Sequence, residues 1–187
     1  MEKEMTGADR RKKLIFLMRE SEQPLSGYHY GGILVSNGDF GYRGNATAKA
    51  PYGNTHGGLV QLHGRWYIFY HRQTHGIECC RQGCAEPVEL DAAGRFHQAE
   101  MTSCGLNSGS LAGLGRYNAC YACNLTHESI GKERLTIRRC VRDDQPHIYE
   151  QPSPDGDPRH ALHYIANMQN GTIAGFKYFV LGQATSI

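Results

Sequence analysis

Residues 54–72 constrain the fold more than any other part of the chain, because their pattern predicts an antiparallel β-hairpin. Residues 59–62 predict a short strand, His63 and Gly64 a turn, and residues 66–70 a strand of aromatic and β-branched side chains. Polar groups suited to ligand binding gather at the ends of this hairpin: Asn54, Thr55, His56, His71 and Arg72. An apolar hairpin with imidazole and guanidinium groups at its mouth suggests one blade of a β-propeller, where such groups face the central channel.

The rest of the first half also predicts short strands joined by turns. Further strands are expected at residues 14–18, 28–36 and 85–90, and Asn37-Gly38-Asp39 is a strong turn signal. The chain has 23 glycines and 11 tyrosines but no long apolar pattern of helical period. The sequence therefore predicts an all-β fold.

The character of the chain changes near Glu100. Residues 103–115 are small and polar and predict a linker or long loop. Strand-like runs follow at residues 117–125, 134–141, 163–168 and 172–181, the last two joined by Asn170-Gly171, a strong hairpin signal. We expect two units, with a β-propeller part over residues 1–102 and a separate β-sandwich over residues 103–187.

Composition excludes several classes of function. The net charge is only +2, with one basic cluster at residues 10–13, so we expect no nucleic-acid partner. No stretch predicts a membrane span or a secretory signal, and a cytoplasmic location is the default expectation. The seven cysteines are odd in number and predict no disulfide framework, and Cys120 and Cys123 lie in a strand-like run that would point their thiols to opposite faces.

Several motifs, in this order, resemble glycoside hydrolase family 43, the five-bladed β-propeller enzymes that include α-L-arabinofuranosidases and β-xylosidases. In the propeller part they are GGILVSNGD at residues 31–39, GNTHGG at 53–58, GRWYIFYHR at 64–72 and RQGCAEP at 81–87. In the second part they are AEMTSCGLN at 99–107, YIANM at 164–168 and AGFKYF at 174–179. The resemblance covers roughly residues 14–187 and implies the last blades of a partial five-bladed propeller, followed by a β-sandwich similar to carbohydrate-binding modules.

The resemblance implies an inverting glycosidase acting on arabinose- or xylose-containing plant polysaccharide or oligosaccharide. Inversion needs a general acid and a general base on opposite faces of the sugar. In the family these carboxylates come from the first three blades, which precede the part matched here. We therefore assign no catalytic residue to this chain and expect it to be inactive alone. A non-catalytic carbohydrate-binding or relic protein is the alternative.

Two residues carry the predicted site. In the family, the His of the segment containing His56 lies on the propeller axis and takes part in binding a calcium ion beneath the sugar, and an Arg at the place of Arg81 reaches the substrate hydroxyls or the acid carboxylate. We therefore expect His56 at a metal and substrate site and Arg81 at the substrate, because a guanidinium group suits paired oxygen ligands. The alternatives are a His that caps the strand and an Arg on the surface.

Other polar and aromatic residues favour structural roles. We expect Trp66 in the core, Asp39 in a turn, Glu86 outside catalysis, and both His71 and Arg72 exposed at the strand end. Five tyrosines of the second region have rings suited to stacking on sugars, but their strand positions favour the core: Tyr117, Tyr121, Tyr149, Tyr164 and Tyr178. An open propeller edge predicts self-association or a partner chain, because it exposes unpaired backbone groups.

Overall fold

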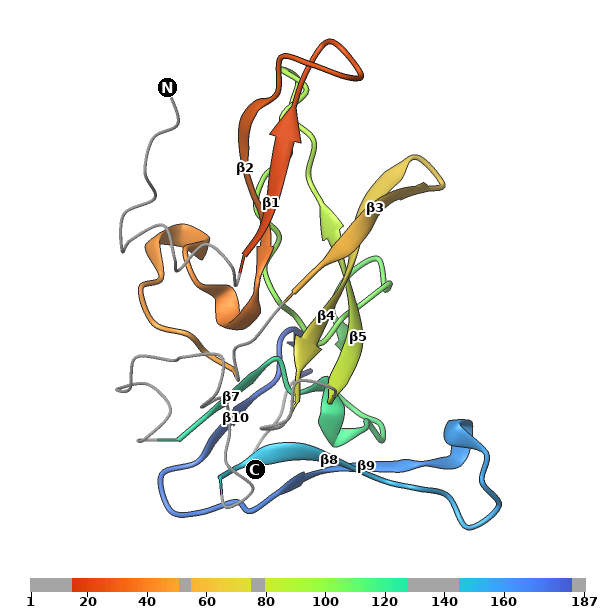
Figure 1. Cartoon of the computed structure of the whole chain (residues 1–187). Coiled ribbons are helices and arrows are strands. Elements are labelled where there is room, and N and C mark those ends of the chain that lie inside the picture. The colour runs from red at the N-terminus through yellow and green to blue at the C-terminus, as the bar shows by residue number, and fades with distance from the viewer. Residues whose placement is uncertain (1–14, 51–54, 75–79, 128–144, 183–187) are drawn as a thin grey trace.

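The computed structural model describes residues 15–50, 55–74, 80–127 and 145–182. Within these ranges the regular structure is β-strands and short 3-10 turns, with no α-helix (Figure 1). The predicted all-β fold is confirmed. No helix of the described chain is long and apolar enough to cross a membrane.

The first sheet is the antiparallel hairpin of β1 (Ile15–Glu20) and β2 (His29–Ser36). β2 ends in a buried 3-10 turn at Asn37–Asp39, as the turn signal predicted. Gly38 has φ of 66°, and a Cβ there would lie 2.7 Å from the backbone nitrogen of Lys49. Glycine is therefore needed at this point, because the chain returns closely past the turn.

The predicted central hairpin is present and forms part of a three-stranded antiparallel sheet. Its strands are β3 (Gly57–Leu62), β4 (Arg65–Gln73) and β5 (Arg81–Val88), in the order β3-β4-β5. His63 and Gly64 form the turn with φ of 49° and 78°. Two positive φ values suit the right-handed twist of a hairpin, which explains why a two-residue connection closes this one.

Three two-stranded sheets make up the described remainder. β6 (Leu111–Ala112) pairs in parallel with β11 (Phe179–Val180), and β7 (Asn124–Thr126) pairs antiparallel with β10 (Ile173–Gly175). β8 (His147–Gln151) and β9 (Leu162–Ala166) form a hairpin that crosses the lower end of the molecule in Figure 1. The strand expected at 134–141 lies outside the described residues, and the β-sandwich and the boundary at residue 102 stay predictions.

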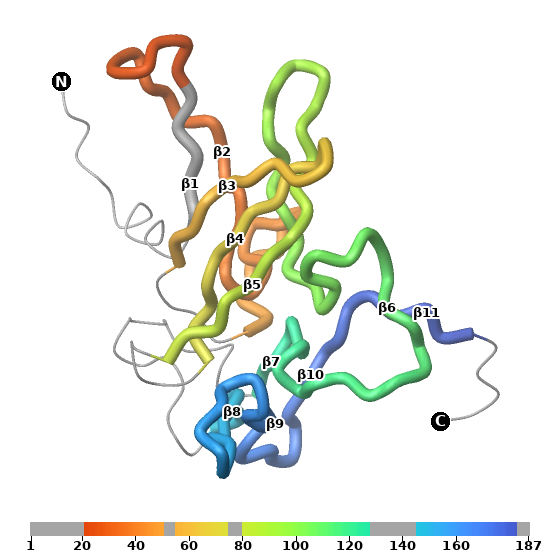
Figure 2. Tube along the Cα trace, turned by 90° about the vertical axis from the view of Figure 1, so that its right-hand side faces the viewer, coloured from red at the N-terminus to blue at the C-terminus, as the bar shows by residue number. Residues whose placement is uncertain are grey.

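The core joins β2, β4 and β5 to later segments of the chain (Figure 2). Leu34, Ile68 and Met101 are among its most deeply buried members. The full cluster is Leu34, Val35, Ala50, Ile68, Tyr70, Val88, Ala99, Met101 and Cys123. Backbone hydrogen bonds reinforce it, from the nitrogen of Ala99 to the oxygen of Leu34 and from the nitrogen of Leu125 to the oxygen of Lys49, each 2.7 Å long.

Candidate functional site

His56 lies immediately before β3, where its exposed ring meets the ring of His71. The two ring centroids are 4.2 Å apart with an interplanar angle of 78°. The hydroxyl of Thr55 donates to the backbone oxygen of His71 over 2.9 Å and fixes this approach. A Cβ at Gly57 would lie 1.8 Å from the backbone oxygen of Phe69, so glycine after His56 lets the chain lie directly against β4.

The described residues around His56 do not test the predicted calcium site. Calcium takes about six to eight oxygen ligands. Within the described ranges, no group of three or more His, Cys, Asp and Glu side chains comes together. Asn54, the neighbouring oxygen donor of the predicted motif, lies outside them. The calcium ion therefore stays a prediction, and no chemistry is derived from it.

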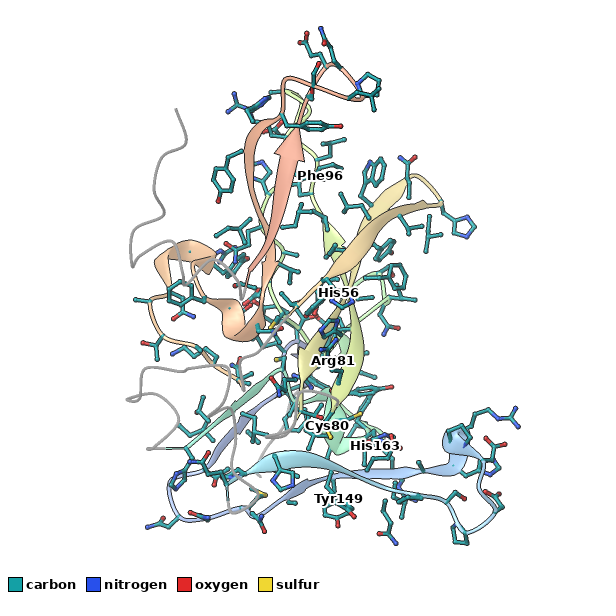
Figure 3. The ribbon with its side chains drawn as sticks, viewed as in Figure 1. His56, Cys80, Arg81, Phe96, Tyr149 and His163 are labelled. Carbon is teal, nitrogen blue, oxygen red and sulfur yellow. The ribbon has the colours of Figure 1, made fainter. Side chains whose placement is uncertain are left out.

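Arg81 begins β5 opposite Gln73 and is exposed. It lines a cavity of about 510 Å³ between the end of the central sheet and the β8–β9 hairpin. The nitrogen of Ile148 donates to the oxygen of Thr74 over 3.2 Å, which holds β8 beside the end of β4. In Figure 3, Arg81, Cys80 and His163 lie on one side of the hairpin, whereas Tyr149 lies on the other.

A pair of polar side chains crosses this hairpin. Glu150 of β8 faces His163 of β9, and their Oε2 and Nε2 atoms are 2.8 Å apart. The second ring nitrogen of His163 lies 3.3 Å from Nδ2 of Asn118. His56 does not line the cavity of Arg81, and it does not line the smaller cavity near Arg72 either. The structure therefore does not bring the two predicted site residues, His56 and Arg81, into one cavity.

A second, smaller cavity of about 300 Å³ also has Gln82 in its lining. Arg72 lines it, and the prediction that Arg72 is exposed is wrong, because only 4% of its surface is accessible. Its Nε and Nη2 atoms donate to Oε1 of Gln82, over 3.0 and 2.9 Å, and Nη1 and Nη2 donate to the backbone oxygens of Ala122 and Cys120, each over 2.7 Å. These hydrogen bonds offset the desolvation cost of burying the guanidinium group, and they hold β4 against the segment before β7. His71 is half-buried rather than exposed.

Glu86 forms the wall beside Arg72 and is 2% exposed. Its Oε1 accepts from the backbone nitrogen of Thr102 and its Oε2 accepts from the hydroxyl of Thr102, each over 2.7 Å. Burial raises the pKa of Glu86 to about 8, although both bonds from Thr102 act in the opposite direction. Both carboxyl oxygens of Glu86 are therefore held by Thr102, which favours a structural role for this group.

Asp39 is a turn residue, as predicted, and is also buried. Its Oδ1 accepts from the nitrogen of Met101 over 2.7 Å, and its Oδ2 lies 2.7 Å from Nζ of Lys177. The same ammonium lies 2.9 Å from Oε1 of Glu100, whose Oε2 accepts from the hydroxyl of Tyr178 over 2.7 Å. Burial disfavours the charge of Lys177, but the bonds to Asp39 and Glu100 outweigh it and raise the pKa of Lys177.

The aromatic residues divide between the core and the surface. Trp66 packs against the core and meets Phe96 edge to face, with centroids 5.3 Å apart, as predicted. The core positions predicted for the five tyrosines are wrong. All five are 37–49% exposed: Tyr117, Tyr121, Tyr149, Tyr164 and Tyr178. Tyr149 and Tyr164 lie on the two-stranded β8–β9 hairpin, whereas the other three lie outside the strands.

The predicted strand at 117–125 is also partly wrong. Residues Ala119–Tyr121 form a 3-10 turn, and the strand is limited to β7. The side chain of Asn118 caps this turn by accepting from the nitrogen of Cys120 over 3.2 Å. Asparagine side chains often bond to nearby backbone groups in competition with sheet hydrogen bonds. Here the bond from Asn118 stabilises a turn where a strand was predicted. Cys120 and Cys123 are both free thiols.

Comparison with known proteins agrees with the predicted resemblance. A xylosidase/arabinosidase from Thermoclostridium stercorarium is 41% identical over 164 residues, which cover 85% of this chain and 34% of that protein. No protein-family model matches the sequence. A solved structure of a glycoside hydrolase family 43 arabinoxylan arabinofuranohydrolase from Bacillus subtilis, in complex with cellotetraose, has 17% identity and a TM-score of 0.38, over 78% of this chain and 26% of that one.

Over most of its length the chain is therefore similar to a xylosidase/arabinosidase, which agrees with the arabinose- and xylose-releasing class that the resemblance implied. It spans about a third of the length of the curated relative that it matches. The matched length is large enough to include most of both predicted units. The individual roles of His56 and Arg81 stay predictions.

Proposed function

We propose that this chain is part of a glycosidase that cleaves O-glycosidic bonds in arabinose- or xylose-containing polysaccharides. The observation that carries the proposal is 41% identity to a xylosidase/arabinosidase over 85% of the chain. In this proposal Arg81 donates hydrogen bonds to sugar hydroxyls from the start of β5. His56 contributes from the edge of the same sheet, and calcium stays an expectation of the family resemblance.

Three carboxyl groups of this chain are engaged in internal bonds, which supports a catalytic acid and base elsewhere in such an enzyme. Asp39 and Glu100 are both bonded to Lys177, and Glu86 is bonded to Thr102. An inverting glycosidase needs an acid and a base about 6.5–9.5 Å apart with room for a water molecule between them. Carboxyl groups engaged in internal bonds do not meet this need, so we assign neither role to these three; the resemblance places the acid and the base in the first three blades.

A segment exchange tests the proposal. This chain replaces the matching segment of the Thermoclostridium relative, and hydrolysis of nitrophenyl arabinofuranoside and nitrophenyl xyloside is measured. We expect the exchanged enzyme to be active and the isolated chain to be inactive. Arg81→Met in the exchanged enzyme is expected to lower kcat/KM about 100-fold, the size of about 3 kcal/mol of lost transition-state binding.

The matched control is Arg159→Met, which removes an exposed arginine that pairs with Asp157 on the β8–β9 connection. It is expected to leave the rate unchanged. Turnover by the isolated chain, or a folded exchanged enzyme that hydrolyses neither substrate, contradicts the proposal.

The edge of the central sheet supports the proposed association with another chain or segment. β3 is an edge strand within the described sheet, and Val60 and Leu62 on it are 41% and 38% exposed. An exposed apolar edge strand is a template for pairing. We expect the isolated chain to self-associate in analytical ultracentrifugation, and Val60→Lys to reduce this association. A clean monomer at high concentration contradicts it.

A further inference from the structure

The dipeptide Asn-Gly occurs twice in the sequence, at Asn37-Gly38 and at Asn170-Gly171. Asparagine is chemically labile, most of all before glycine, because a residue without a Cβ lets its backbone nitrogen reach the side-chain amide carbon of the asparagine. Asn37 and Gly38 are buried, whereas Asn170 and Gly171 are exposed. The two copies therefore carry the same chemistry in opposite surroundings, and the fold decides which of them can react.

Asn170 and Gly171 are the two central residues of a turn in the connection from β9 to β10. The nitrogen of Thr172 donates to the oxygen of Gln169 over 3.0 Å, and the nitrogen of Gln169 donates to Oγ1 of Thr172 over 2.9 Å. Gly171 has φ of 85°, the value of the third residue in a type II turn. β9 pairs with β8 and β10 pairs with β7, so the two strands do not form the hairpin that Asn170-Gly171 predicted, and each keeps its partner independently of this turn.

The surroundings of Asn37 oppose the same reaction. Asn37 is 0% exposed, and the nitrogen of Gly38 donates to Sδ of Met101 over 3.0 Å. The backbone nitrogen of Lys49 lies so close to Gly38 that even a Cβ there would be 2.7 Å from it. The nitrogen that would attack is thus held by Met101 in a closely packed part of the core. Reaction at Asn37 needs this part of the core to open first.

We infer that Asn170 is a site of spontaneous deamidation in the folded chain, and that the fold protects Asn37 from it. The backbone nitrogen of Gly171 attacks Cγ of Asn170, the new C–N bond closes a five-membered succinimide, and the side-chain nitrogen leaves as ammonia with the proton of Gly171. Water then adds to one of the two ring carbonyl groups, breaks its bond to the ring nitrogen and leaves aspartate or isoaspartate. Water is the co-reactant, and no group is oxidised or reduced.

The product is a more acidic form of the chain that stays folded. A carboxylate replaces a neutral amide, so the formal net charge falls by one, from +2 to +1. Isoaspartate also lengthens the backbone of the turn by one methylene group. Because β9 and β10 are held by strands outside the turn, the change leaves their pairing intact and the modified form accumulates. The inference is independent of the proposed function.

Peptide mapping by mass spectrometry tests the inference on the full chain, kept folded at mildly alkaline pH in water enriched in oxygen-18. We expect labelled aspartate and isoaspartate at Asn170 to form at least 10-fold faster than at Asn37, because Asn37 reacts only through opening of the core. Asn170→Asp gives the elution standard for the acidic form in ion exchange. Asn170→Gln is the matched control and is expected to remove that form, because glutamine would have to close a six-membered ring.

A series of urea concentrations separates the effect of the fold from that of the sequence. We expect the rate at Asn37 to rise with the unfolded fraction, measured by the fluorescence of Trp66, and to approach the rate at Asn170 in the unfolded chain. The rate at Asn170 is expected to change little across the transition. Equal rates at the two sites in the folded chain, or an Asn170 that reacts only after unfolding, overturns the inference.

Discussion

Replacing Glu86 by glutamine is expected to remove most of the pH dependence of stability that this carboxyl group confers. Glu86 is 2% exposed, and burial raises its pKa from 4.5 to about 8. Asp39 raises the pKa further, whereas Thr102 and Lys177 lower it. The glutamine side chain has the same shape, and its oxygen and amide can bond to the nitrogen and the hydroxyl of Thr102.

Whether stability rises or falls with pH depends on how many protons Glu86 binds in the folded and in the unfolded chain. Between about pH 4.5 and about pH 8 the folded chain holds the Glu86 proton and the unfolded chain does not, so stability falls as pH rises. From about pH 5.5 to about pH 8.5 the free energy of unfolding is expected to fall by about 3 kcal/mol on account of this group, at about 1.4 kcal/mol per pKa unit.

The assay is urea unfolding of the unmodified chain and of Glu86→Gln at both pH values, followed by tryptophan fluorescence of Trp66. We expect the difference in unfolding free energy between the two proteins to change by about 3 kcal/mol across the interval. Glu89→Gln, at an exposed position near the same strand, is the control and is expected to follow the unmodified chain. Parallel curves for Glu86→Gln and the unmodified chain refute the burial argument.

Three further substitutions test the packing described above. Lys177→Met is expected to cost about 2–4 kcal/mol of stability in urea unfolding, because Asp39 stays buried without its cation; recovery in the double variant with Asp39→Asn checks the pairing. Arg72→Met is expected to cost about 2–4 kcal/mol in the same assay, because Oε1 of Gln82 and the backbone oxygen of Ala122 lose their Arg72 donors and that of Cys120 keeps only Gln82. Gly57→Ala is expected to lower the thermal midpoint by several degrees, since its Cβ would lie 1.8 Å from a backbone oxygen; an unchanged midpoint contradicts that contact.

Local chemistry explains which predictions succeeded. The central hairpin was predictable because its turn dipeptide and its aromatic strand agree, and β4 pairs with β3 in the expected register. The turn at Asn37–Asp39 was predictable from its residue types. Trp66 was correctly placed against the core because a large aromatic in a central strand gains most from burial.

Distant contacts explain which predictions failed. Arg72 lies at the end of a strand, and its sequence surroundings suggest a surface. Its burial depends on the backbone oxygens of Cys120 and Ala122, which lie about fifty residues later. No local pattern encodes that meeting. The prediction for the tyrosines failed for the same reason, since a local pattern does not say whether a residue will lie in a strand or whether another part of the chain will cover its ring.

The sequence by itself determined the all-β class, the central hairpin and the relationship to xylosidases and arabinosidases, because these depend on residue types at short spacing. Only the tertiary structure decided that His56 does not line the cavity of Arg81, that Lys177 joins Asp39 to Glu100, and that Glu150 and His163 share a cavity with Arg81. Those arrangements join residues many positions apart, and their energies come from burial and charge pairing, which exist only after the chain has folded.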